Sequence, residues 1–450
     1  MLLNEQESKS ICDKLLGYVK ADDAEVSATS GVSSHLRFAD NSFRTSGRRE
    51  DTDVTVTVWI DKKKGSATGN ELDDASLRGV VEQAEQLARV SPVDREYVPS
   101  LGPQNYRPTE GFVEATANVA LAPRAKALGD VIAACEKENV VGAGFHQTRG
   151  GTVAGASRHG NFYFYRSSLA SLSVTARTRE GSGSGYFLRN HFDVSKFDTA
   201  RIGREALQKA LQSRQPRALE PGVYTVILEP QAVADLLGFF FSSRFDARMA
   251  DEGRSPFSAA GGKTKVGQRI FDERLSVYSD PWNPELPGPP VAMGGIPARK
   301  FVLVKNGALE NLVYNRYWAQ QKHAEPSPGP VNVIMEGGEQ PATERAMIEA
   351  TAKGLVVSRF WYIRPTDPRT AALTGLTRDG VWYVANGKVQ FPVHNFRFNE
   401  SLLELLAPGN VELIGAPERV GRSESQGESA ALLPALKVKE FHFTSQSEAV

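Results

Sequence analysis

Cysteine is almost missing from this sequence of 450 residues, which contains only Cys12 and Cys135. Two thiols cannot build a disulfide framework, and they cannot supply a cysteine-rich zinc site. Long hydrophobic runs are missing as well, since no apolar stretch approaches the roughly 20 residues that cross a bilayer. The acidic first seven residues have neither the basic region nor the apolar run of a signal peptide. We therefore expect a cytoplasmic protein with no membrane partner.

An excess of charge of either sign is also missing. The 53 lysines and arginines equal the 53 aspartates and glutamates, so the formal net charge is zero. Proteins that bind nucleic acid usually carry a basic patch or stripe. The balanced composition predicts that nucleic acid is not a partner.

What is present is the pattern of an α+β protein in three parts. Residues 1–108 predict an N-terminal domain of helices and antiparallel sheet, in which Val54, Val56, Val58 and Ile60 alternate as in a strand. Proline-rich sequence over 92–108 predicts a linker. Residues 109–219 predict a central α+β domain, and 220–450 a large C-terminal domain.

Hairpin signals dominate the C-terminal part. Asn306-Gly307 and Asn386-Gly387 each follow a short apolar run. Asn-Gly accepts positive φ at both central positions of a tight hairpin turn. Because strands do not alternate with helices at βαβ spacing, we predict a C-terminal domain rich in antiparallel β hairpins.

Common catalytic motifs are incomplete in this sequence. Gly262-Lys263-Thr264 resembles the end of a phosphate-binding loop, but Phe257 stands where the motif needs glycine. No two of the seven histidines lie within five residues, so no helical pair of metal ligands exists. Three of them occur in the central segment and could either converge or make ordinary contacts: His146, His159 and His191.

A helix predicted over 231–244 is more informative. Pro230 suits a first helical turn. Five apolar residues fall on one helical face: Val233, Leu236, Leu237, Phe240 and Phe241. Taken alone, this is the pattern of a buried core helix.

Six short blocks of sequence, in their order and spacing, give this helix a context. Together they resemble the TldD/PmbA family of metallopeptidase-related proteins, also labelled "modulator of DNA gyrase", across residues 221–446. The blocks are 226–228, 254–258, 301–309, 354–360, 384–393 and 434–438. The first 100 residues resemble the N-terminal domain of the family more weakly.

In the catalytic branch of that family, the helix carries the motif H-E-x-x-x-H and a later Cys-Gly pair supplies a third metal ligand. Ungapped alignment places Gly238 and Ser243 at the two histidine positions, Phe239 at the glutamate and Val420 at the cysteine. Glycine, phenylalanine and valine offer no metal donor, and serine alone is a poor zinc ligand. The resemblance therefore implies the TldE/PmbA-like branch, with neither a catalytic nor a metal-binding residue in this chain.

This resemblance implies a non-catalytic subunit that pairs with a metal-bearing, TldD-like subunit or with itself as a dimer, and that helps to bind unfolded peptide. It implies no cofactor in this chain and zinc in the partner. The phenylalanines at 239–241 are expected to make the former metal pocket apolar, and Arg244, Asp246 and Arg248 to contact peptide or partner. Two alternatives stay open: an active metallopeptidase with a relocated metal site, drawing on the three central histidines, and a homodimeric peptide-binding module.

Overall fold

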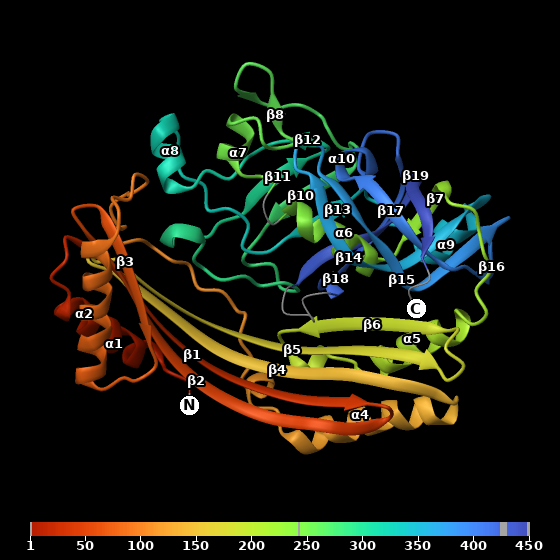
Figure 1. The fold of residues 1–450 in the computed structure, drawn as a ribbon, viewed down its shortest axis with the longest axis horizontal. Coiled ribbons are helices and arrows are strands. Elements are labelled where there is room, and N and C mark those ends of the chain that lie inside the picture. Colours follow the sequence, from red (N-terminus) through yellow and green to blue (C-terminus); the bar gives the residue numbers. More distant parts are fainter. Residues whose placement is uncertain (1, 242–243, 424–429, 448–450) are drawn as a thin grey trace.

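The N-terminal and central segments form one long, curved sheet. The computed structural model describes residues 2–241, 244–423 and 430–447, and Figure 1 shows this sheet as an arc beneath the C-terminal part. All neighbouring strands are antiparallel, and β1 pairs directly with β4, so segments on both sides of the 92–108 linker share one sheet. The strands, in the spatial order β3-β2-β1-β4-β5-β6, are β3 (Lys63–Gly69), β2 (Ser42–Ile60), β1 (Asp23–Ala39), β4 (Val140–Ser157), β5 (Phe162–Thr178) and β6 (Ser184–His191).

One face of this sheet is apolar and covered by helices. Alternate residues of β1, such as Val26, Ala28 and Phe38, are buried on it because successive side chains of a strand point to opposite faces. The helices of this part are α1 (Glu5–Tyr18), α2 (Asp74–Val90), α3 (Glu114–Ala117), α4 (Leu121–Lys137) and α5 (Thr199–Gln212). Asn4 and Glu7 form a capping box at the start of α1, and Asp73 caps α2.

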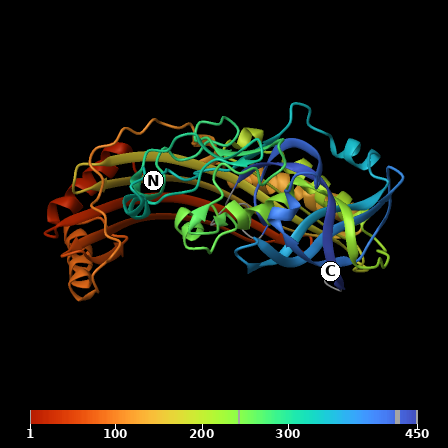
Figure 2. The same cartoon turned by 90° about the horizontal axis from the view of Figure 1, so that it is seen from above.

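The opposite, concave face is polar. Glu25, Ser27 and Thr29 alternate with the apolar residues of β1 and lie on this face. Near β6 the C-terminal part packs on it, since the Arg359 guanidinium lies 3.9 Å from the centre of the Tyr186 ring. Figure 2 shows the resulting elongated molecule, with the red N-terminal helices at one end and the blue C-terminal strands at the other.

The C-terminal part contains an eleven-stranded sheet. Its main path is β12-β11-β10-β13-β19-β17-β15-β14-β7, with β16 on β15, β18 on β19 and a further β19–β7 pairing. The strands are β7 (Gly222–Leu228), β10 (Leu275–Ser279), β11 (Phe301–Lys305), β12 (Ala308–Leu309), β13 (Ile334–Gly337), β14 (Lys353–Asp367), β15 (Ala372–Ala385), β16 (Lys388–Pro392), β17 (Asn395–Ser401), β18 (Val411–Val420) and β19 (Ala431–Ser447). The short strands β8 (Ser258–Ala259) and β9 (Lys263–Thr264) form a separate hairpin.

Short helices complete this part. They are α6 (Pro230–Phe241), α7 (Ala247–Asp251), α8 (Arg316–Lys322), α9 (Glu344–Glu349) and α10 (Leu402–Leu405), with 3₁₀ turns at η1 (Val194–Lys196) in the central segment and η2 (Met293–Gly295). The helix expected over 231–244 is α6, which directly follows β7. Among the described residues, no helix is long and apolar enough to cross a membrane.

The predicted hairpin turns are confirmed. Asn306 and Gly307 have φ of 48° and 75°, and Asn386 and Gly387 have 51° and 72°. The predicted α+β class is confirmed too, with an N-terminal helix and antiparallel sheet and a larger, β-rich C-terminal part.

Candidate functional site

A cavity of about 630 Å³ lies beside α6, and we refer to it as the α6 cavity. Helix α6 contributes Ala234, Gly238 and Phe241 to its wall. The remaining wall comes from segments distant in sequence, and most of it is apolar: Phe245, Asp246, Met249, Met293, Val313, residues 328–333, residues 420–422, Ala430, Ala431 and Leu433.

The side chain of Arg422 lies against the helix at Gly238. A Cβ atom added to Gly238 would stand only 2.2 Å from the Cδ of Arg422. The guanidinium lies 4.1 Å from the centre of the Phe239 ring, a distance typical of a cation–π contact. The space that a side chain at position 238 would use is therefore taken by an arginine.

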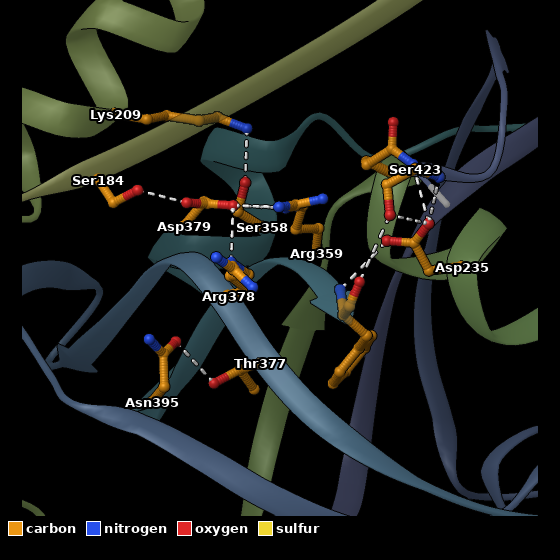
Figure 3. Close-up of polar contacts among 12 residues, drawn as sticks. Ser184, Lys209, Asp235, Ser358, Arg359, Thr377, Arg378, Asp379, Asn395 and Ser423 are labelled. Atoms are coloured by element: carbon orange, nitrogen blue, oxygen red, sulfur yellow. Dashed lines mark hydrogen bonds and ion pairs between the residues drawn. The ribbon is translucent and has the colours of Figure 1, made fainter. Parts of the chain in front are cut away.

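Buried Asp235 holds the segment that carries Arg422. Its Oδ1 accepts hydrogen bonds of 2.8 Å from both the backbone N–H and the hydroxyl of Ser423, and its Oδ2 accepts from the N–H of Phe360 at 3.1 Å (Figure 3). Gln231 donates to the Gly421 carbonyl at 2.7 Å. Burial raises the pKa of Asp235 to about 6, against the lowering effect of these hydrogen bonds.

The positions singled out by the sequence are only partly brought together. Gly238 and Val420 both line the α6 cavity, and Phe239 lies under Arg422. The three phenylalanines diverge: Phe241 lines the cavity, whereas Phe240 is buried among Phe245, Phe257 and Phe271. Ser243 lies outside the described residues.

The three charged residues after α6 have different surroundings. Asp246 lines the α6 cavity and caps α7, accepting from the Met249 N–H at 2.7 Å. Arg248 is paired with Glu96 at 2.7 Å and with Glu252 at 2.9 Å. Burial lowers the pKa of Arg244, while Asp367 acts in the opposite direction. Asp246 is thus the one of the three that reaches the cavity wall.

These residues do not fit a zinc ion. Gly238 has no side chain, Phe239 and Val420 offer only hydrocarbon, and the cationic Arg422 lies directly beside them. In the part of the chain that the structure describes, no three His, Cys, Asp or Glu residues cluster so as to hold a metal ion elsewhere.

The three central histidines each make separate contacts. The Nδ1 of His146 accepts from Arg124 at 3.1 Å, and burial lowers the pKa of His146 to about 3. His159 contacts Ser100 at 2.8 Å, and His191 accepts from the N–H of Asp193 at 2.9 Å. The structure does not bring them together.

Sequence reasoning missed Asp235, Arg422 and Ser423. One signal was available for Asp235, because it is a carboxylate inside a largely apolar helix, and such a group needs buried partners. No local signal pointed to Arg422, whose position depends on long-range strand pairing.

A second polar network joins the central segment to the C-terminal sheet (Figure 3). Buried Asp379 accepts hydrogen bonds from Ser184 of β6 and, at 2.6 Å, from the Nε of Arg359. Lys209 of α5 pairs with Glu229 and donates to Ser358 at 2.8 Å. Charged side chains therefore fix how the two sheets meet.

Comparison with known proteins agrees with this architecture. Models of the PmbA/TldA metallopeptidase match the chain in three stretches: domain 1 over residues 24–88, the central domain over 113–214 and the C-terminal domain over 221–445. The fold is similar to that of TldE from Thermococcus kodakarensis, with a TM-score of 0.85, 19% identity and coverage of 97% of this chain and 99% of that one.

Two curated relatives match in sequence. Metalloprotease PmbA of Escherichia coli O157:H7 is 24% identical over 448 residues, covering 93% of this chain and 92% of that protein. An uncharacterized protein, MJ0231, of Methanocaldococcus jannaschii is 30% identical over 120 residues, which span 26% of this chain and 27% of that protein. This chain therefore belongs to the PmbA/TldD family of metallopeptidase-related proteins.

Proposed function

We propose that this chain is a cytoplasmic, non-catalytic subunit of a PmbA/TldD-type metallopeptidase. In this proposal it pairs with a metal-bearing H-E-x-x-x-H subunit and helps to bind unfolded peptide in the α6 cavity. The zinc belongs to the partner, and this chain contributes binding surface.

The observation that carries the proposal is the contact between Arg422 and α6. In the alignment above, Gly238 stands at a metal-ligand position. In the structure, the Arg422 side chain lies against the Cα of Gly238, and its guanidinium lies over the Phe239 ring. A fixed cation in this place repels a metal ion and attracts anionic or carbonyl oxygen atoms. A site built in this way supports binding rather than hydrolysis.

The lining of the α6 cavity also suits an extended peptide. Apolar walls with a few placed polar groups are typical of ligand pockets, and 630 Å³ lies within their usual range of roughly 300–1,000 Å³. Arg422 and Asp246 both belong to the wall and place opposite charges beside the polar atoms of a bound backbone. The apolar wall accepts side chains with little selectivity.

Co-expression with an H-E-x-x-x-H relative tests the pairing. We expect native mass spectrometry to show a heteromeric complex, with zinc in the relative and peptide hydrolysis by the complex. A chain that forms no complex under these conditions, or that alone binds stoichiometric zinc and hydrolyses peptide, would overturn the proposal. A homodimer that binds peptide without the relative would favour the self-associating module instead.

Variants of the complex test the role of the cavity. Arg422→Ala is expected to weaken binding of unfolded peptide about ten-fold without preventing assembly, because a charge-assisted hydrogen bond is lost. Arg345→Ala is the matched control, since that arginine is exposed and pairs with Glu349 on the surface of α9. Equal peptide binding by both variants would rule out a role for Arg422.

A further inference from the structure

A second cavity, of about 330 Å³, lies between the concave face of the N-terminal sheet and the loop 291–295, and we refer to it as the polar cavity. Its walls include Glu25, Ser157, Asn161, Tyr163 and Tyr165. Loop 291–295 also contributes Met293 to the α6 cavity, so the same short loop borders both cavities.

Strand register explains why these polar groups gather. Glu25 of β1 pairs with Ser157 of β4, whose backbone is hydrogen-bonded to Asn161. Tyr163 of β5 pairs with Gly155 of β4, which lies two residues before Ser157 and therefore on the same face of the sheet. Directly opposed residues of antiparallel strands point to the same side, so these side chains converge on the concave face. Glycine at 155 leaves room for the Tyr163 ring, since a Cβ there would lie 2.3 Å from it.

One residue in the wall of the polar cavity, Asn161, carries an acceptor that lacks a donor among the described residues. Tyr106 donates to the Gly295 carbonyl at 2.5 Å, so its oxygen must accept the 2.7 Å bond from the Nδ2 of Asn161. This fixes the amide of Asn161, which is 5% exposed, and its Oδ1 has no donor within the described part of the chain. A buried amide oxygen without a donor is costly, so a ligand donor that reached it from the cavity would gain a hydrogen bond.

Glu25 adds a charge to this set. Across the described ranges, its carboxylate has neither a hydrogen bond nor an ion pair, although the residue is half-buried. Burial raises the pKa of Glu25, and Asp23 raises it further, while Arg316 and Lys64 lower it. A partly desolvated carboxylate gains from a cation bound directly against it.

We propose that the polar cavity binds a primary ammonium group carried by a peptide, either its N-terminal amine or a lysine side chain. An ammonium group has three hydrogen-bond donors and no acceptor, and the cavity wall includes Glu25, Asn161, Tyr163 and Tyr165, whose side chains carry a carboxylate, an amide oxygen and two hydroxyls. The volume, near the lower end of the range for ligand pockets, suits one residue or side chain. The choice of a peptide as the carrier rests on the proposed function, whereas the recognition of an ammonium group does not.

A metal ion fits this set less well. Glu25 is the one carboxylate among the residues that line the polar cavity. Calcium takes six to eight oxygen ligands, often with several carboxylates among them, and zinc prefers imidazole and thiolate. Organic ammonium is therefore the better match to one carboxylate with neutral oxygen atoms.

Binding of an alanine-rich pentapeptide with a C-terminal fluorophore tests the proposal on the full chain. Three forms separate the sources of the ammonium: a free N-terminus, an acetylated N-terminus, and an acetylated peptide with one lysine. We expect fluorescence anisotropy to show at least about ten-fold weaker binding when the only amine is acetylated. Tight binding of the acetylated lysine peptide would assign the site to a side chain, and its failure to bind would assign it to the N-terminus.

Two variants and a small amine complete the test. Glu25→Gln keeps the size of the side chain and should lose about ten-fold in ammonium binding, whereas Glu82→Gln, on the exposed surface of α2, should lose none. If n-butylamine raises the melting temperature of the wild type but not of Glu25→Gln, the ammonium site is supported even if no peptide binds. In that case only the proposal that a peptide carries the ammonium group is overturned. Equal binding of free and acetylated peptides, equal behaviour of Glu25→Gln and Glu82→Gln, or no response to any amine would overturn the ammonium site.

Discussion

At the scale of single residues, Gly238 shows how a missing side chain shapes the α6 cavity. Glycine inside a helix costs about 0.5–1 kcal/mol relative to alanine. Alanine would normally be the better choice here, but Arg422 lies where its Cβ would stand. The glycine and the arginine therefore depend on each other, and this dependence can be measured.

We predict that Gly238→Ala lowers the free energy of unfolding by about 1–3 kcal/mol, because the added methyl overlaps the Arg422 side chain. In an Arg422→Ala background the sign should reverse, and alanine should stabilise by about 0.5–1 kcal/mol. Urea unfolding of the double-mutant cycle measures this coupling. Gly79 in α2 is the control, since a Cβ there meets nothing within 4 Å and alanine should stabilise in both backgrounds. Identical effects at both glycines would contradict the described contact.

The buried carboxyl of Asp235 should make the free energy of unfolding depend on pH. The pKa of Asp235 in the folded chain, about 6, lies above the ordinary 3.8. Between these values the folded chain binds more protons than the unfolded chain, so the free energy of unfolding falls as pH rises from 4 to 6. The contribution is about 3 kcal/mol for a shift of roughly two pKa units.

Asp235→Asn removes this titration. We expect the stability of the variant relative to wild type to rise by up to about 3 kcal/mol between pH 4 and pH 7, measured by urea unfolding at several pH values. Asp130→Asn, an exposed change on α4, should leave the pH profile of the wild type unchanged. A profile of Asp235→Asn parallel to that of the wild type would show that the pKa of Asp235 is not raised.

At the scale of elements, Lys209 ties α5 to the start of α6. Lys209 and Glu229 are both about nine-tenths buried, and Ser358 of β14 accepts a further hydrogen bond from the lysine. We predict that Lys209→Met destabilises the chain by about 3–5 kcal/mol, because it leaves the Glu229 carboxylate buried without its cation.

Thermal and urea unfolding measure the effect of Lys209→Met. The double variant Lys209→Met with Glu229→Gln should recover part of the loss, since the unpaired charge is then removed. Lys9→Met, which breaks an exposed pair with Asp13, should cost less than about 1 kcal/mol. A loss at Lys209 no larger than that at Lys9 would mean that the buried pair contributes little.

Elements with strong local signals were predictable from sequence. The apolar face of α6 and the Asn-Gly turns rest on local periodicity and on backbone conformations that few residues adopt. The full length of β1 was not predicted, because Ser27, Thr29 and Gly31 on its polar face carry no hydrophobic signal. The pairing of β1 with β4 is also hidden, since it joins residues more than 100 positions apart.

Residues of the candidate site could be named from the sequence only where the alignment with the family motif identified their positions. Gly238 and Val420, which the alignment placed at two metal-ligand positions, line one cavity. Arg422 was missed because its contact depends on how the end of β18 meets α6, which composition and spacing do not determine. The polar cavity was missed for the same reason, since its groups come together through sheet register.

At the scale of the whole molecule, buried charges join the two large sheets. Arg359 and Asp379 belong to the C-terminal sheet, while Ser184 and Tyr186 contact them from β6. Burial alone would raise the pKa of Asp379, but Arg359 and Ser184 hold it below its ordinary value. This junction positions the concave face, and with it the polar cavity, relative to the C-terminal part.

Asp379→Ala should therefore uncouple the two sheets. Arg359 would be left buried without its carboxylate, at a cost of about 3–5 kcal/mol. We expect one urea transition in the wild type and two in the variant, the C-terminal sheet unfolding first. Fluorescence of single-tryptophan versions separates them, with Trp59 reporting on the N-terminal sheet and Trp382 on the C-terminal one. Glu349→Ala, which breaks an exposed pair on α9, should keep a single transition. A single transition in Asp379→Ala at the wild-type midpoint would show that the junction does not couple the sheets.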